Sequence, residues 1–362
     1  MKVLILSNSC YGLYLFRREI VEALLNLNYE VYISVPNDAR VAKFVDIGCH
    51  FIETRISRHG MNPITDFMLL MKYKSMLKEL KPDIVFTYTI KPNVYGGLAC
   101  QMCKVPYLAN ITGLGVAIQN GGILQKISMT MYKMGLKGAK RVFFQNSENH
   151  HFMTENAIVT SPTTILPGSG VNLERYAYAE YPSEEDGIHF LFVGRIMKDK
   201  GIDELLETAK KIKDIYSNVV FDVIGEYDGL YESVIKMAHK EAVIQYHGWQ
   251  EDIRPFYRAC HCVVLPSYHE GMSNVLLEGA AIGRPLIASD IPGCREIVQN
   301  GVNGFLCEAR NSDSLYKAII KMLHINNKEK QNMGKQSRSL VELIFDRKII
   351  IKKYLDEIYI KS

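Results

Sequence analysis

The sequence predicts an α/β protein built from two doubly wound, Rossmann-like domains. Its 362 residues exceed what one hydrophobic core usually supports, so two domains are the natural expectation. Short β-branched runs bounded by turn residues alternate with stretches of helical periodicity, a pattern typical of parallel sheets covered by helices. Residues 173–187 are rich in Tyr, Glu, Pro and Ser and lack apolar periodicity, so they divide the pattern into two halves.

About six strands are expected in each half of the chain. In the first half they cover residues 3–7, 30–36, 50–55, 83–89, 107–112 and 142–146. In the second half they cover residues 189–194, 219–225, 244–248, 262–266, 286–289 and 305–307.

The predicted domains are residues 1–170 and 188–340, joined by a linker at 171–187 and followed by an amphipathic terminal helix within 341–362. Ligands bind at the carboxyl ends of parallel strands. Two such domains facing across a cleft would place two crevices opposite one another, which suits an enzyme with two substrates.

The composition narrows the class of protein. With 48% hydrophobic and 23% charged residues the chain is of the ordinary globular kind. No run of 18 apolar residues is present, so no membrane span is expected, and the apolar start is too short for a signal peptide. Eight cysteines in such a chain indicate reduced thiols in the cytoplasm.

The charge is distributed unevenly. Residues 1–170 carry 18 Lys and Arg against 11 Asp and Glu, whereas residues 171–362 carry 25 against 28. The first half therefore either faces something anionic or is simply well solvated.

Two kinds of site are not expected. A dinucleotide-binding domain would show G-x-G-x-x-G after its first strand, but only Gly12 follows residues 3–7, and the pair Gly113 and Gly115 lacks a third glycine. Cys100 and Cys103 have the spacing of metal ligands, but no second pair completes a set of four. The sequence therefore predicts no resident metal and no cofactor.

Residues 265–285 carry most of the chemistry in the second half. A strand ends at Pro266, a loop bears Glu270 and Gly271, and a helix begins near Ser273. The free N–H groups of that helix form an anion site. Glu270 and Glu278 beside it suit polyhydroxyl groups, which carboxylates bind as strong acceptors. The alternative is that both are solvated helix glutamates.

A cationic pair lies at an earlier strand–helix turn. Arg195 follows Gly194 at the end of a strand, and Lys200 precedes Gly201 at the start of the next helix. A planar guanidinium and a compact ammonium at such a turn make a natural clamp for a diphosphate. The alternative is a pair of solvated cations.

Taken in order, these motifs resemble the retaining nucleotide-sugar glycosyltransferases of family 4, which have the GT-B fold. The matching residues are Gly194-Arg195, Lys200-Gly201, Val223-Ile224-Gly225 and His247-Gly248. They also include the two glutamates Glu270 and Glu278, which are separated by seven residues. The resemblance implies a UDP-sugar donor, no metal, and a terminal helix that crosses back onto the first domain.

The resemblance also implies roles for particular residues. Arg195 and Lys200 would bind the donor diphosphate and neutralise the leaving group. Glu270 would contact the donor sugar and Glu278 the ribose, and Trp249 would lie beside the base or else in the core. The expected catalytic residues are Arg195, Lys200 and Glu270. The expected donor-binding residues are Gly12, Gly194, Gly225, Trp249, Gly271, Met272, Ser273, Asn274, Val275 and Glu278.

Residues 87–96 and 110–115 resemble a subfamily that elongates polyprenyl-diphosphate-linked oligosaccharides. The expected acceptor-binding residues are Tyr14, Arg17, Lys91, Asn93 and Thr112. Many family members carry a catalytic-loop histidine where this chain has Thr112-Gly113. A side-chain base is therefore not indicated, which fits the family's same-face mechanism, in which the departing phosphate oxygen takes the acceptor proton.

Two predicted helical segments, residues 67–81 and 123–141, are rich in Met and Lys. Such helices either lie on an anionic bilayer or simply pack on the sheet. We expect a cytoplasmic enzyme, peripheral at the inner face of the plasma membrane. It would transfer a sugar, possibly an N-acetylhexosamine, to a polyprenyl-diphosphate-linked glycan in bacterial polysaccharide or glycoprotein glycan assembly, and would not bind nucleic acid.

Two rival functions keep the same fold. One is a UDP-N-acetylglucosamine 2-epimerase-like enzyme, which would turn over without an acceptor. The other is a non-catalytic GT-B partner subunit, which would have no need of Arg195, Lys200, Glu270 and Glu278 together.

Overall fold

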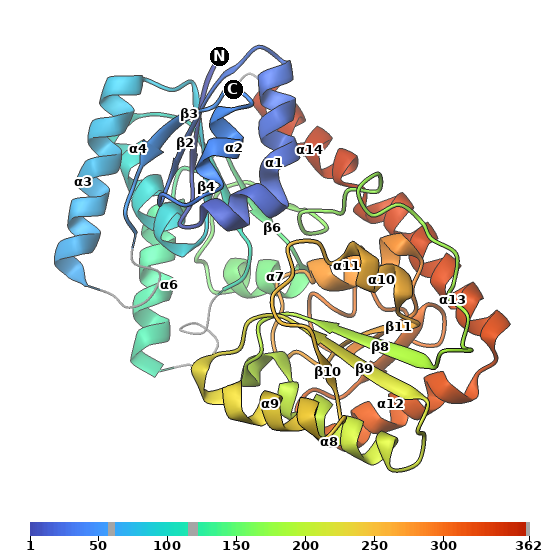
Figure 1. Ribbon diagram of the computed structural model, residues 1–362. Coiled ribbons are helices and arrows are strands. Elements are labelled where there is room, and N and C mark those ends of the chain that lie inside the picture. The colour runs from blue at the N-terminus through green and yellow to red at the C-terminus, as the bar shows by residue number, and fades with distance from the viewer. Residues whose placement is uncertain (57–61, 115–121, 360–362) are drawn as a thin grey trace. The chain divides into compact units, whose positions relative to one another are not determined.

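The computed structural model describes residues 1–56, 62–114 and 122–359, and the chain divides into two compact units. The first unit comprises Met1–Ser169 and the chain from Ile350 onward, and the second comprises Gly170–Ile349. Each unit contains one parallel sheet with helices on both faces, so the predicted fold class is confirmed (Figure 1).

The first sheet has seven parallel strands in the order β3-β2-β1-β4-β5-β6-β7. Their bounds are β1 (Lys2–Leu6), β2 (Glu30–Val35), β3 (His50–Glu53), β4 (Ile84–Tyr88), β5 (Tyr107–Ile111), β6 (Arg141–Phe144) and β7 (Thr163–Ile165). Six of them match the predicted runs. The seventh, β7, was not predicted because it is a three-residue edge strand without buried side chains, and it lacks the apolar pattern of the others.

Helices cover both faces of the first sheet. One face packs against α1 (Cys10–Asn26), α2 (Val41–Val45) and α14 (Arg347–Tyr359). The other packs against α3 (Pro63–Leu80), the π-helical turn η1 (Pro92–Gly96), α4 (Gly97–Cys103), α6 (Gly122–Leu136) and α7 (Ser147–Glu155). Side chains of neighbouring strand positions point to opposite faces, so Leu4 and Val3 lie in different cores.

The second sheet has six parallel strands, the number predicted, and their order is β10-β9-β8-β11-β12-β13. They are β8 (Ile188–Val193), β9 (Val219–Ile224), β10 (Gln245–Tyr246), β11 (Cys262–Leu265), β12 (Leu286–Ser289) and β13 (Gly304–Cys307). The helices and turns are η2 (Lys198–Lys200), α8 (Ile202–Lys213), η3 (Gly229–Tyr231), α9 (Glu232–Lys240), α10 (Arg254–Ala259), α11 (Asn274–Ile282), α12 (Ser312–His324), α13 (Asn327–Leu340) and η4 (Val341–Phe345). Figure 1 shows α8, α9 and α12 on one side of this sheet and α10 and α11 on the other.

The predicted linker is wrong as a separate segment, because residues 171–187 pack on the second unit. Val171 is 1% and Tyr176 8% exposed, and the Tyr181 hydroxyl donates to the His261 carbonyl oxygen at 3.1 Å. Tyrosines spaced too irregularly to give a helical or strand period can still be buried by the surface of a neighbouring element.

The predicted terminal helix within 341–362 is divided between the units. The turn η4 and the start of α14 belong to the second unit, where Val171 exchanges backbone hydrogen bonds with Phe345 and Arg347. From Ile350 on, α14 belongs to the first unit, and Ile350, Tyr354 and Ile358 lie in its core. Within residues 1–56, 62–114 and 122–359, none of the helices combines the length and apolar character required to cross a bilayer.

Candidate active site

The predicted donor-binding residues of the second half gather in loops that leave the carboxyl ends of the strands. Arg195 and Lys200 follow β8, Gly225 follows β9, Trp249 follows β10, and Glu270 follows β11. In open parallel sheets this edge is the usual place for a ligand. The parallel order of the strands therefore brings these separate motifs to one side of the second unit.

Glycines hold two of these loops close together. Neither position has room for a side chain. A Cβ on Gly225 would lie 1.8 Å from the carbonyl oxygen of Gly194, and a Cβ on Gly201 would lie 2.0 Å from the carbonyl oxygen of Pro266. Both glycines also have positive φ, 145° and 72°. The Tyr268 N–H donates to the Asp199 carbonyl oxygen at 2.9 Å, which fixes η2 against the loop after β11.

Lys200 and Glu270 form one ion pair. The Lys200 Nζ lies 2.5 Å from Glu270 Oε1, and the Ser267 hydroxyl donates to the same oxygen at 2.9 Å. The two side chains are 21% and 14% exposed. The sequence analysis assigned Lys200 to the donor diphosphate and Glu270 to the donor sugar. The structure shows the two side chains in one ion pair, so each orients the other.

Arg195 differs from Lys200. Its side chain is exposed, and it has no hydrogen bond or ion pair to any of the described residues. An exposed guanidinium on the same strand–helix turn as a fixed ammonium can adapt to an anion that arrives at the turn.

The helix after Glu270 begins as predicted. Ser273 caps α11, and its hydroxyl accepts from the Leu276 N–H at 3.2 Å. Gly293, with φ 83°, packs against Gly271, and its carbonyl oxygen accepts from the Ser273 N–H at 2.9 Å. Met272 is buried, whereas Gly271, Asn274 and Val275 are half-buried.

Glu278 lies on α11 beside aromatic side chains. Its Oε2 accepts from the Tyr257 hydroxyl at 3.0 Å. Burial raises the pKa of this carboxyl group, although hydrogen bonds from Tyr176 and Tyr257 and the nearby charges of Arg347 and Arg175 act in the opposite direction. A carboxyl group whose pKa is raised by burial and lowered by specific partners is a common sign of a functional site.

Trp249 is 48% exposed, so the alternative of a core residue is excluded. It follows Gly248, whose φ is 70° and whose carbonyl oxygen accepts from the Gly225 N–H at 2.9 Å. The Trp249 indole therefore lies on a loop that is hydrogen-bonded to the residue after β9.

Two predicted residues of the first unit lie around the start of α1. Gly12 donates its N–H to the Ser9 hydroxyl at 3.0 Å, within the cap of α1. The Tyr14 hydroxyl accepts from Arg18 at 2.9 Å.

Two of the predicted acceptor-binding residues are engaged within the first unit. Lys91 is paired with Asp66, at 2.7 Å between Nζ and Oδ1. Asn93 is 0% exposed, and its amide group bonds to the Thr87 hydroxyl and to the Asn110 carbonyl oxygen, so its role as an acceptor contact stays a prediction. Asn93 fixes β4 to β5. Thr112 is half-buried just after β5, and Gly115 lies outside the described residues.

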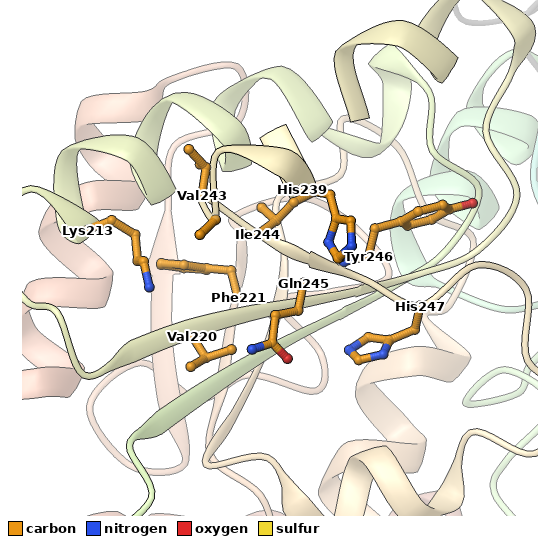
Figure 2. Close-up of a pocket in the computed structure, with 10 residues that line it drawn as sticks. Lys213, Val220, Phe221, His239, Val243, Ile244, Gln245, Tyr246 and His247 are labelled. Atoms are coloured by element: carbon orange, nitrogen blue, oxygen red, sulfur yellow. The ribbon is translucent and has the colours of Figure 1, made fainter. Parts of the chain in front are cut away.

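A separate cavity of about 340 Å³ lies along the edge strand β10 (Figure 2). Lys213, Phe221, Gln245 and His247 are among its lining residues. None of Arg195, Lys200, Glu270 and Glu278 lines it, so this cavity is not the predicted donor site.

Sequence reasoning missed the residues that support the site. Ser267 holds Glu270, Tyr176 and Tyr257 bond to Glu278, and Tyr268 fastens η2. Ser267 and Tyr268 lie inside the segment already singled out, so their position was a usable signal. Tyr176 lay in the supposed linker, and nothing in its local pattern pointed to Glu278.

The fold is that of GT-B glycosyltransferases, and comparison with known proteins identifies the chain as a glycosyltransferase. Residues 178–340 match the family "Glycosyl transferases group 1", and residues 2–146 match the family "Glycosyl transferase 4-like". Since the two matches cover the core of both units, the chain belongs to the glycosyltransferases.

Two curated relatives match most of the chain. One is N,N'-diacetylbacillosaminyl-diphospho-undecaprenol alpha-1,3-N-acetylgalactosaminyltransferase of Campylobacter jejuni, 27% identical over 98% of this chain and 97% of its own length. Another is UDP-Gal:alpha-D-GlcNAc-diphosphoundecaprenol alpha-1,3-galactosyltransferase of Escherichia coli, 26% identical over 86% of each chain.

Among solved structures, Anabaena Alr3699/HepE in complex with UDP and glucose has a TM-score of 0.82 at 17% identity and covers 100% of both chains. Sucrose-phosphate synthase of Thermosynechococcus elongatus has a TM-score of 0.79 at 19% identity, with 98% of each chain covered. At these identities the likeness supports the fold.

Proposed function

We propose that this protein is a retaining, metal-independent glycosyltransferase that moves a sugar from a UDP-sugar to a polyprenyl-diphosphate-linked glycan. The observation that carries the proposal is the full-length match to the Campylobacter enzyme, whose name specifies a diphospho-undecaprenol acceptor, combined with a preformed Lys200–Glu270 pair. The Escherichia relative acts on the same class of acceptor, and the Anabaena neighbour binds UDP.

The chemistry of the donor loops fits a departing diphosphate. The bond between the anomeric carbon and the β-phosphate oxygen breaks, and the acceptor hydroxyl oxygen bonds to that carbon from the same face. The acceptor proton passes to the departing phosphate oxygen. In this proposal Lys200 and Arg195 stabilise the negative charge that develops on UDP, and Glu270, held by Lys200, stabilises the positive charge that develops on the sugar.

A UDP-release assay tests this function. We expect UDP release from at least one UDP-sugar to increase strongly when a polyprenyl-diphosphate-linked glycan is added, and to persist in EDTA because Lys200 and Arg195 supply the cationic charge. Anomeric NMR of the product should show the donor configuration. Turnover of the donor sugar without acceptor would favour the epimerase, and no turnover at all would favour a non-catalytic subunit. Loss of activity in EDTA that Mn²⁺ restores would contradict metal independence.

We further propose that the first unit binds the inner, anionic surface of the plasma membrane through α3 and α6. The first turns of these helices expose large apolar side chains: Ile64 is 74%, Phe67 62%, Met68 64%, Ile123 78% and Leu124 54% exposed. Lysines follow on both helices. Both helices contribute to the same core, so they cover the same face of the first sheet. Apolar tips flanked by lysines suit a bilayer that carries anionic headgroups.

Vesicle flotation tests this surface. We expect the protein to float with anionic vesicles at low salt and to dissociate in part at high salt, because each lysine near the surface contributes about 1 kcal/mol that salt screens. Changing Lys72, Lys133 and Lys137 to Glu should abolish flotation. The Phe67→Ser, Ile123→Ser variant should lose the fraction that resists high salt.

Leu230→Ser is the matched control, because Leu230 is 84% exposed but belongs to the second unit. It should float like the wild type. Wild type that stays in the soluble fraction at low salt, or a charge-reversed variant that floats equally well, would contradict the proposal, and α3 and α6 would then only cover the sheet.

A further inference from the structure

The face of α1 that covers the first sheet carries a charged residue. Its buried side chains are Cys10, Leu13, Arg17, Ile20, Val21 and Leu24. Their spacing of three and four residues is that of an amphipathic helix facing a core. Arg17 is only 6% exposed, and an arginine in such a stripe is unfavourable unless something compensates its charge.

Other buried charged side chains among the described residues do have polar partners. The carboxylates are hydrogen-bonded: Asp66 accepts from Lys91 and Tyr95, and Asp222 bonds to His189 and His247. The cations are also satisfied: Lys330 pairs with Glu184, and Arg347 donates to the Gly170 carbonyl oxygen. Arg284 donates to five backbone carbonyl oxygens, those of Tyr257, Ala179, Gly283, Glu180 and Arg258. Arg17 has no hydrogen bond or ion pair to any described residue. Its contacts are with two aromatic rings, its Cζ lying 5.2 Å from the centroid of Tyr88 and 5.9 Å from that of Tyr354.

A second polar group without a well-formed hydrogen bond lies in the same place. The Tyr88 hydroxyl is buried and makes no hydrogen bond of ordinary geometry among the described residues, although the Tyr354 hydroxyl lies near enough to interact with it. The Tyr354 hydroxyl, by contrast, donates to Asn110 Oδ1. Tyr88 is the last residue of β4 and is the register partner of Asn110 on β5. The unpaired Arg17 guanidinium and the Tyr88 hydroxyl, which has no well-formed hydrogen bond, therefore lie together at the carboxyl edge of the first sheet, where parallel sheets bind their ligands.

We infer that Arg17 and Tyr88 form a phosphate-binding site in the first unit and that its ligand is the diphosphate of the acceptor. The choice of ligand rests on the proposed function. A guanidinium offers a planar pair of donors that matches phosphate oxygens, and a phenol hydroxyl adds a further donor. No carboxylate hydrogen-bonds to either group among the described residues, so an anion would meet no competing acceptor there.

Inorganic pyrophosphate is the probe for this site. The protein is first saturated with UDP, so that pyrophosphate cannot stabilise it through Lys200 and Arg195. We expect pyrophosphate then to raise the Tm of the wild type by several degrees and to have no such effect on the Arg17→Met variant. Without any anion, Arg17→Met should have a higher Tm than the wild type, because it replaces an unpaired buried cation with an apolar side chain of similar length.

Arg18→Met is the matched control, since Arg18 is the next residue of α1 but pairs with Glu22. It should keep the full response to pyrophosphate. The inference is overturned if pyrophosphate fails to stabilise the UDP-saturated wild type, or if it stabilises Arg17→Met equally.

Acceptor kinetics separate this inference from the proposed function. Arg17→Met should raise the KM for a polyprenyl-diphosphate-linked acceptor about 10- to 100-fold, the usual effect of losing a hydrogen bond to a charged group. A synthetic acceptor without phosphate should show the same KM with both proteins. If sugar is transferred but Arg17→Met leaves the KM for the diphosphate acceptor unchanged, the function stands and the site is wrong. If pyrophosphate binds at Arg17 but no acceptor is glycosylated, the function is wrong and the anion site stands.

Discussion

The Lys200→Ala variant is expected to lose at least a hundredfold in kcat and about tenfold in affinity for UDP. In the transition state the negative charge on the departing diphosphate grows, so a fixed ammonium there stabilises the transition state more than bound UDP. Lys200 is fixed by its 2.5 Å contact with Glu270 and by the packing of Gly201 on Pro266. Steady-state kinetics and calorimetric titration with UDP measure the two effects.

Lys198→Ala is the matched control for this prediction. Lys198 lies in the same turn, η2, and carries the same charge, but its side chain is exposed. It should keep nearly the full kcat. If both variants lost activity equally, the general positive charge of the turn would matter and the particular position of Lys200 would not.

The Glu270→Ala variant should lose about 10²- to 10³-fold in kcat while its affinity for UDP changes little. Glu270 is assigned to the transferred sugar, where its contact strengthens as positive charge develops at the anomeric carbon. Glu278→Gln is the variant for comparison. Glu278 is assigned to the ribose, which is the same in the ground state and the transition state. Its effect should therefore be about tenfold on UDP affinity, with little change in kcat at saturation.

The stability of Glu278→Gln should change in the opposite direction to its affinity. The pKa of Glu278 is raised in the folded protein, so ionisation of this carboxyl group costs stability, and the cost declines as the pH falls from the folded pKa to the unfolded one. Glutamine resembles the neutral form and can still accept from Tyr257, so Tm at pH 7 should rise. Equal loss of UDP affinity in the Glu270 and Glu278 variants, or a lower Tm for Glu278→Gln, would contradict these assignments.

Local patterns predicted most elements of the fold because each strand and helix repeats its apolar side chains with its own period. Twelve of the strands in the described chain could be placed in this way, whereas β7 could not, because three half-buried or exposed residues have no period to detect. The boundary between the units fell at Ser169, close to the predicted position, but the burial of residues 171–187 was missed.

The sequence by itself determined the class of fold, the position of each motif at the end of a strand and the identity of the charged residues in the donor loops. Only the tertiary structure decided which of those residues have partners. It paired Lys200 with Glu270, buried Asn93, exposed Trp249 and left Arg17 unpaired beside Tyr88. The reason is physical: periodicity is a property of neighbouring residues, whereas the partner of a charged group can lie far away in the chain. Lys200 and Glu270 are 70 residues apart and Lys330 and Glu184 are 146 apart, and only the packed fold brings each pair together.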